Sequence, residues 1–139
     1  MKVTAIYRHH PTASLSVPLA GSCVAAGFPS PADDYAEQPL DLSAYLVKNP
    51  AATMLVRARG ASMRDAGIND GDLLVVDRSV EATDGRVVIA VVDGEFTVKR
   101  LRRRGGNVWL AAANEKFKDI PVSGDDMIWG VVVHSIHSL

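Results

Sequence analysis

Apolar and polar positions follow different patterns in two parts of the chain. Residues 1–40 show no sustained period and contain most of the seven prolines, together with many Ser, Ala and Gly residues. That composition predicts an extended, flexible N-terminal arm. From residue 41 to residue 139, short apolar runs alternate with turn residues, which predicts a separate folded domain.

The domain is expected to begin with one short helix and to continue as strands. Asp41 can cap a helix whose apolar residues share one face, and Pro50 is expected to stop it. Asp93-Gly94 joins two apolar runs, as a tight β-hairpin turn does. Strands are expected over residues 52–58, 72–77, 86–92, 95–101, 107–113 and 127–137. We therefore predict a mostly β protein: a compact antiparallel β barrel or sandwich with an extended N-terminal arm and one short helix.

Composition and charge narrow the class of protein. A length of 139 residues with 47% apolar and 22% charged residues fits one globular domain. The formal net charge of −1 argues against a general polyanion binder. A single cysteine, Cys23, excludes an internal disulfide framework and favours a reducing compartment, so we expect a cytoplasmic protein. No run approaches the ~20 apolar residues of a membrane span, and prolines and charges interrupt any signal-peptide core.

The segment RGASMRD, residues 59–65, places Ser62 between small residues directly after an apolar run. A serine hydroxyl becomes an effective nucleophile when a neighbouring base removes its proton. Ser62 is not in a GxSxG motif, and the four histidines lie at the two ends of the chain, so a Ser-His-Asp site has no support. An ordinary turn serine is the simpler interpretation of these residues alone.

Lysine can replace histidine as the base when burial lowers its pKa and leaves a neutral amine. Lys99 is the lysine that lies inside an apolar strand, EFTVKRL, where it shares a face with Thr97 and Leu101. The alternative is an edge strand from which the Lys99 side chain extends into solvent. On spacing alone, that alternative is the simpler one.

The arm contains a segment suited to be a peptide substrate. In VAAGFPSP, Ala26 is small enough for a narrow specificity pocket, and Gly27 allows close backbone approach on the leaving side. Extended peptides also bind by adding a strand to the edge of a sheet. The arm could therefore be the substrate of its own domain.

These residues and their spacing resemble the LexA/UmuD family of self-cleaving serine peptidases. The resemblance is carried by GFPSPADDYAEQPLDL, GASMRDAGINDGDLLVVDRS, VVIAVVDGEFTVKRL and WGVVVHSI, which together cover most of the chain from Gly27 onward. Ser62 lies 36 residues after Ala26, and Lys99 lies 37 residues after Ser62, in line with the family pattern. The resemblance implies the fold of the LexA-like C-terminal domain.

The resemblance also implies a serine–lysine autopeptidase that cuts its own chain between Ala26 and Gly27. Ser62 would be the nucleophile, and Lys99 the general base that later protonates the leaving amine. The oxyanion would be stabilised by the backbone N–H of Ser62 and by a neighbour in its turn, which also holds Gly60, Ala61 and Met63. Two departures stand out: UmuD itself is cut after cysteine rather than alanine, and the first 26 residues match the family poorly.

The family also implies partners. Its members are stimulated to cleave by a RecA filament on single-stranded DNA, in the SOS response to DNA damage. The cleaved dimer then joins a UmuC-type DNA polymerase for translesion synthesis. The resemblance thus implies a homodimer, with contacts from the C-terminal strand MIWGVVVHSI, and it implies neither a cofactor nor a membrane partner.

Two other functions stay open at this stage. The chain could be a non-enzymatic interaction module that keeps the fold for dimerisation. It could also be a fragment of a LexA-type repressor that regulates transcription. The 26 residues before the cut site contain prolines and no amphipathic helical pattern, and a helix-turn-helix needs more chain. Sequence-specific DNA binding is therefore not expected.

Two further clusters carry weaker signals. The basic run KRLRRRGG, from Lys99 to Arg104, holds five of the fifteen basic residues and suits either phosphate contact or a solvated strand end. His134 and His137 are three residues apart, which in a strand places them on opposite faces. His9-His10 is an isolated pair in the arm, so no metal site is expected.

Overall fold

A computed structural model describes residues 1–8, 16–20, 36–122 and 127–139 of the chain. The described residues fall into two compact units. The larger unit contains residues 1–8 and 49–139, and the smaller one contains the described residues between them. The cut site expected at Ala26-Gly27 lies outside the described residues.

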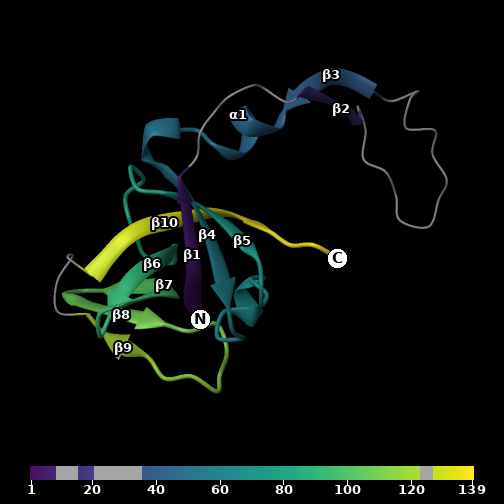
Figure 1. Ribbon diagram of the computed structural model, residues 1–139. Coiled ribbons are helices and arrows are strands. Elements are labelled where there is room, and N and C mark those ends of the chain that lie inside the picture. Colours follow the sequence, from purple (N-terminus) through teal and green to yellow (C-terminus); the bar gives the residue numbers. More distant parts are fainter. Residues whose placement is uncertain (9–15, 21–35, 123–126) are drawn as a thin grey trace. The chain divides into compact units, whose positions relative to one another are not determined.

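The larger unit is built almost entirely from strands (Figure 1). Its elements are β1 (Lys2–Arg8), the 3-10 helix η2 (Pro50–Ala52), β4 (Thr53–Arg59), the 3-10 helix η3 (Arg64–Ala66), β5 (Leu73–Asp77), β6 (Val87–Val92), β7 (Glu95–Arg104), β8 (Asn107–Ala111), β9 (Ile120–Pro121) and β10 (Ile128–Ile136). The smaller unit consists of β2 (Ser16–Ala20), β3 (Ala36–Asp41) and α1 (Leu42–Leu46). In it, β2 and β3 form an antiparallel pair.

Six strands of the larger unit close into an antiparallel barrel. Their order is β1-β4-β5-β10-β6-β7, and β1 pairs with both β4 and β7. β8 and β9 extend the sheet beyond β7. Together with a single α-helix among the described residues, this architecture confirms the predicted mostly β barrel.

Two apolar clusters hold the barrel together. The first draws side chains from β4, β5, β6 and β7, so it is the barrel interior; its buried members are Met1, Val56, Ala58, Met63, Ile68, Leu74, Val76, Ile89 and Val98. The second includes Leu110 of β8 and packs β8 against the outside of the barrel; its buried members are Val88, Ala90, Leu101, Leu110 and Val131. The run VVIAVV of β6 serves both clusters because successive side chains of a strand point to opposite faces.

The hairpin between β6 and β7 forms as predicted and sets the position of Lys99. Asp93 and Gly94 have φ angles of 51° and 78°, the left-handed pair that a primed two-residue turn requires. The turn fixes the register in which Val88 lies opposite Lys99. Lys99 is consequently held in the middle of the sheet, on the opposite face of β7 from Val98.

The N-terminal segment differs from the prediction. The sequence predicts an extended arm over residues 1–40, but Lys2–Arg8 forms strand β1 of the barrel. Met1 is only 8% exposed and belongs to the interior cluster, and Val3 packs against the same cluster. These contacts are made with strands more than 50 residues away in the chain, so the local pattern carries no sign of them.

The helix begins as predicted and ends early. Asp41 caps α1, because its carboxylate accepts a hydrogen bond of 3.2 Å from the Ala44 N–H. The helix ends at Leu46 rather than at Pro50, which instead begins η2. Asn49, the residue before Pro50, has φ of −127°, as expected for a position where proline disfavours helical backbone. Among the described residues, no helix has the length and apolar character to cross a membrane.

Candidate active site

Ser62 lies in a tight turn that joins β4 to η3. Gly60 adopts φ of 114°, which favours glycine, and its N–H donates a 2.8 Å hydrogen bond to Asp70. The Arg64 N–H donates to the Ala61 carbonyl at 3.2 Å, and the fully buried Met63 side chain anchors the turn in the barrel interior. The turn is thus held on both sides of Ser62.

The Ser62 hydroxyl is buried and contacts the N-terminal residue. Ser62 is 1% exposed, and its Oγ accepts a hydrogen bond of 2.5 Å from the Met1 amino group. The Met1 carbonyl accepts hydrogen bonds from Thr97 Oγ1 at 2.7 Å and from the Val98 N–H at 3.0 Å. The main chain of Met1 therefore bridges the Ser62 turn and β7.

Lys99 is a buried lysine without a carboxylate partner among the described residues. The side chain lies 5.9 Å from the ring centroid of Phe117, and the residue is 6% exposed. Burial lowers the pKa of Lys99 below its usual value, because desolvation disfavours the charged ammonium. The alternative in which Lys99 extends into solvent is excluded by this burial.

The Met1 amino group contacts Ser62 and lies within electrostatic range of Lys99. Burial, then the charges of Lys99 and Lys2, lower the pKa of that amino group from 8.0 to about 6. Within the described part of the chain, the Ser62 hydroxyl is bonded to Met1, and the structure contains no hydrogen bond between Ser62 and Lys99. Ser62 thus acts on the Met1 amino group through a hydrogen bond, and Lys99 acts on the same amino group through its charge.

The loop between β8 and β9 contacts the Ser62 turn. Asn114 is 5% exposed, and its side-chain Nδ2 donates a 3.0 Å hydrogen bond to the Ala61 carbonyl. The Asp65 N–H donates to the Ala113 carbonyl at 2.8 Å, which joins the loop to the Ser62 turn a second time. Sequence reasoning missed Met1, Asn114 and Phe117. Nothing local marks any of them, since Asn114 and Phe117 lie in a polar segment and Met1 is a terminal residue.

The turn offers free backbone donors at the nucleophile candidate, because the N–H groups of Ala61, Ser62 and Met63 have no hydrogen-bond acceptor among the described residues. The Gly60 N–H is taken by Asp70, and the Arg64 N–H is taken by the Ala61 carbonyl. Among the described residues, no acceptor contacts the Ser62 N–H. Of the predicted oxyanion turn, Gly60 is thus already committed, whereas Ser62 retains an N–H for an incoming oxyanion.

His137 belongs to a separate cluster at the end of the C-terminal strand. His137 Nδ1 lies 2.6 Å from Asp72 Oδ1, and Ser135 Oγ donates to Asp72 Oδ2 at 2.9 Å. Burial alone would raise the pKa of Asp72, but the hydrogen bonds from the Asn69 N–H, Ser135 and His137 hold it below its usual value. Among the described residues, no group of three or more metal-binding side chains occurs. This cluster ties the end of β10 to the start of β5.

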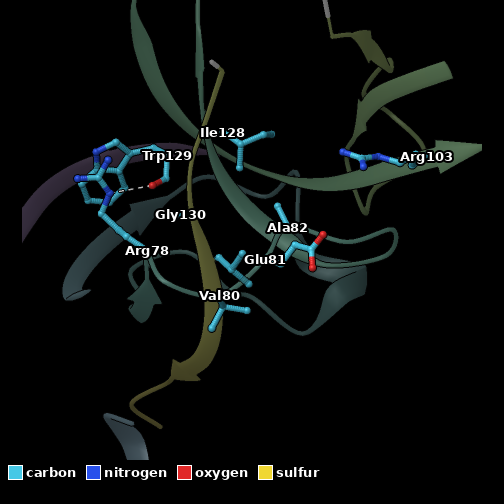
Figure 2. Close-up of a pocket in the computed structure, with 9 residues that line it drawn as sticks. Arg78, Val80, Glu81, Ala82, Arg103, Ile128, Trp129 and Gly130 are labelled. Carbon is cyan, nitrogen blue, oxygen red and sulfur yellow. Dashed lines mark hydrogen bonds between the residues drawn. The ribbon is translucent and has the colours of Figure 1, made fainter. Parts of the chain in front are cut away.

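The basic run and a nearby cavity lie apart from Ser62. Arg102, Arg103 and Arg104 are exposed at the end of β7. A cavity of about 290 Å³ lies between Arg103 and Trp129, and Arg78 stacks on the Trp129 ring at 4.6 Å (Figure 2). Its lining contains neither Ser62 nor Lys99, so it is no part of their site.

Comparison with known proteins places the chain in a family. Residues 18–133 match the family described as Peptidase S24-like. The chain is 50% identical over 125 residues to the protein ImpA of Salmonella typhimurium, a match that covers 86% of this chain and 83% of ImpA. It is 45% identical over 124 residues to the protein MucA of Escherichia coli, covering 87% of this chain and 84% of MucA.

The chain also matches the sequence of a repressor. The chain is 46% identical over 113 residues to the LexA repressor of Aliivibrio fischeri. That match covers 81% of this chain but 53% of the repressor. The shared part is therefore about half of the LexA protein and most of the chain described above.

Proposed function

Because the chain belongs to the Peptidase S24-like family, we propose that it is a serine–lysine peptidase that cuts its own chain between Ala26 and Gly27. The observation that carries the proposal is the burial of Ser62 and of Lys99, with no carboxylate among the described residues to hold the lysine charged. Ser62 is hydrogen-bonded to the Met1 amino group, and the charge of Lys99 acts on the same group. Burial favours the neutral amine that a general base must be. The family match and the spacing of the three positions support the same assignment.

The proposed reaction needs only groups of this chain and water. Ser62 Oγ attacks the carbonyl carbon of Ala26 while Lys99 Nζ takes the hydroxyl proton. The bond to Gly27 breaks as Lys99 returns that proton to the leaving nitrogen. Water then attacks the Ala26 ester with Lys99 again as base, which frees residues 1–26 as a carboxylate and restores the Ser62 hydroxyl. The Ser62 N–H stabilises the oxyanion in both steps.

Before attack, the Ser62 hydroxyl must exchange its contact with Met1 for the Ala26 carbonyl. In the described structure the Met1 amino group is bonded to the attacking oxygen. The amine has a pKa of about 6, so near neutral pH it is mostly uncharged and adds little positive charge beside Lys99. Its withdrawal therefore exposes the nucleophile without separating an ion pair.

We place this reaction in the SOS response, with RecA on single-stranded DNA as the stimulus and a UmuC-type polymerase as the partner of the cleaved homodimer. The support is the resemblance of the chain to UmuD and its sequence identity of 50% to ImpA and 45% to MucA. Incubation with RecA, ATP and single-stranded DNA should produce a fragment that begins at Gly27, detected by mass. The same mixture without DNA should cut much more slowly. A chain that keeps its full mass in the complete mixture would instead support a non-enzymatic interaction module.

A further inference from the structure

The strand that closes the barrel belongs to the segment that self-cleavage would cut off. β1 lies before the proposed cut at Ala26-Gly27, while its partners β4 and β7 lie after it. Six residue pairs join β1 to β4, and Lys2 pairs with Thr97 of β7. Loss of residues 1–26 would therefore open a seam between two strands of the barrel.

The start of β1 is seated as deeply as a core element. Met1 contributes its side chain to the interior cluster, and its carbonyl accepts two hydrogen bonds from Thr97 and Val98. Val3 packs against the same cluster, while Thr4 points to the exposed face. Removing this strand would leave a cavity in the core, the edge of β4 without a partner, and β7 unpaired at Thr97, before the part of β7 that pairs with β8.

We propose that residues 1–26 stay bound after self-cleavage, with β1 still paired in the barrel as a separate peptide. The seam between β4 and β7 is thus a strand-binding surface whose occupant is residues 2–8 of the same chain. None of the contacts that hold β1 involves Ala26 or Gly27, so hydrolysis of the bond between those two residues breaks none of them. The cleaved protein is then a two-chain complex, and the seam opens only when the peptide dissociates. This inference rests on the proposed cut at Ala26-Gly27.

The test compares denaturing and native masses of the cleaved protein at neutral pH. Under denaturing conditions the two fragments should appear separately. Under native conditions they should travel together, with the mass of the intact chain plus one water per protomer. A cleaved wild-type protein whose 27–139 fragment travels alone would overturn the proposal.

Two adjacent substitutions make a matched pair for this test. Val3→Asp places a carboxylate against the interior cluster, whereas Thr4→Asp places the same charge on the exposed face one residue later. Thr4→Asp gives up only a long, exposed hydrogen bond of 3.4 Å from the Thr4 hydroxyl to the Arg57 carbonyl of β4. Both leave fragment 27–139 unchanged in sequence. We expect Val3→Asp to release the peptide at least about tenfold faster than wild type, and Thr4→Asp to retain it. Equal release from the two variants would contradict the proposal.

The design separates this inference from the proposed function. The recognition sequence of another, site-specific protease can be inserted between residues 26 and 27. That protease then makes the same cut without any action of Ser62. Retention in that chain supports the strand-binding seam even when the wild type fails to cut itself. Release from it overturns the seam while leaving self-cleavage intact.

Asn114 contacts the peptide group that directly precedes Ser62. The Ala61 carbonyl accepts hydrogen bonds from the Asn114 side chain at 3.0 Å and from the Arg64 N–H at 3.2 Å. That carbonyl and the Ser62 N–H belong to one planar trans peptide, so they point in opposite directions. A hydrogen bond that fixes the Ala61 oxygen therefore also fixes the direction of the Ser62 N–H. Hydrogen bonding to the oxygen further polarises the N–H as a donor.

We infer that Asn114 is a positioning residue for the oxyanion donor of the proposed reaction. It is 5% exposed, and its Oδ1 accepts a 3.2 Å hydrogen bond from the Lys116 N–H, which fixes the amide orientation. It lies in the loop that brings Phe117 over Lys99. The residue thus acts on the reaction through the Ser62 turn, without itself contacting the scissile bond.

The test is the rate of self-cleavage against pH in Asn114→Ala and Asn114→Asp chains. We expect both to cut about 10- to 100-fold more slowly at every pH, because the N–H loses its orientation. The pH midpoint should stay that of wild type in Asn114→Ala, since Lys99 is untouched. It should rise in Asn114→Asp, because the added carboxylate favours the charged form of Lys99. Asn107→Asp, at the exposed start of β8, is the matched control and should cut normally. A wild-type rate in both Asn114 variants, or a shifted midpoint in Asn114→Ala, overturns this inference, whereas an uncut wild type would instead count against the proposed function.

Discussion

Replacing Ser62 by alanine should lower the rate of self-cleavage by about 10⁴-fold or more, because the reaction then has no nucleophile. The change removes one buried oxygen and its hydrogen bond to the Met1 amino group, so the barrel itself should persist. The measurement is the loss of full-length chain over time at alkaline pH, where neutral lysine is favoured. Ser62→Ala should remain whole while the wild type is converted.

A second serine provides the control for this variant. Ser43→Ala alters a residue of α1 whose side chain makes no hydrogen bond in the described structure, so it should cut at the wild-type rate. Conversion of Ser62→Ala at a rate within tenfold of wild type would mean that another group attacks the chain. In that case the assignment of the nucleophile fails.

Replacing Lys99 by methionine should have two opposite effects. Self-cleavage should fall by about 10²- to 10⁴-fold, because the general base is lost. Thermal stability at neutral pH should rise, because an apolar side chain of similar length replaces a buried ammonium that has no carboxylate partner. A loss of activity together with a gain in stability is what a buried, unpaired base predicts. Loss of activity accompanied by a lower unfolding temperature would contradict this explanation.

The same burial determines how stability depends on pH. The pKa of Lys99 is lowered in the folded chain, so the unfolded chain binds more protons between that lowered value and the usual 10.5. Stability should therefore rise as the pH increases through the folded pKa, and the gain should end near 10.5. In Lys99→Met this rise should be missing, which can be checked by chemical unfolding across the alkaline range.

Local sequence signals predicted much of the barrel. Asp93-Gly94 specified the β6–β7 hairpin because only a left-handed pair of residues closes that turn, and Asp41 specified the start of α1 through its carboxylate. Both features depend on a few adjacent residues. α1 ends at Leu46, where Val47 already adopts extended backbone, so the restriction that Pro50 places on Asn49 is not what ends the helix.

Features that depend on distant contacts were missed. β1 is a strand because β4 and β7 offer it edges and the barrel interior takes the Met1 side chain. Its own residues, MKVTAIYR, carry too weak an alternation to predict this. Propensity and period describe a segment alone, whereas the partner strands that stabilise β1 lie far along the chain.

The residues of the candidate site also differ in whether the sequence alone could reveal them. Ser62 and Lys99 could be selected from the sequence, because one lies in a small-residue turn and the other is a lysine inside an apolar strand. The Met1 amino group and the Asn114 amide could not, since only the folded chain brings them to the Ser62 turn. The substrate residues Ala26 and Gly27 remain a prediction.

The most direct test of a neutral Lys99 as the base is a ¹³C NMR titration of its side chain in the uncut Ser62→Ala chain. The Lys99 signal is identified by its loss in a second chain that also carries Lys99→Met. We predict that Lys99 titrates below its usual value of 10.5, at the pH where the self-cleavage rate of wild type reaches half its maximum. A Lys99 that stays charged across the range in which the rate rises would contradict its assignment as the general base.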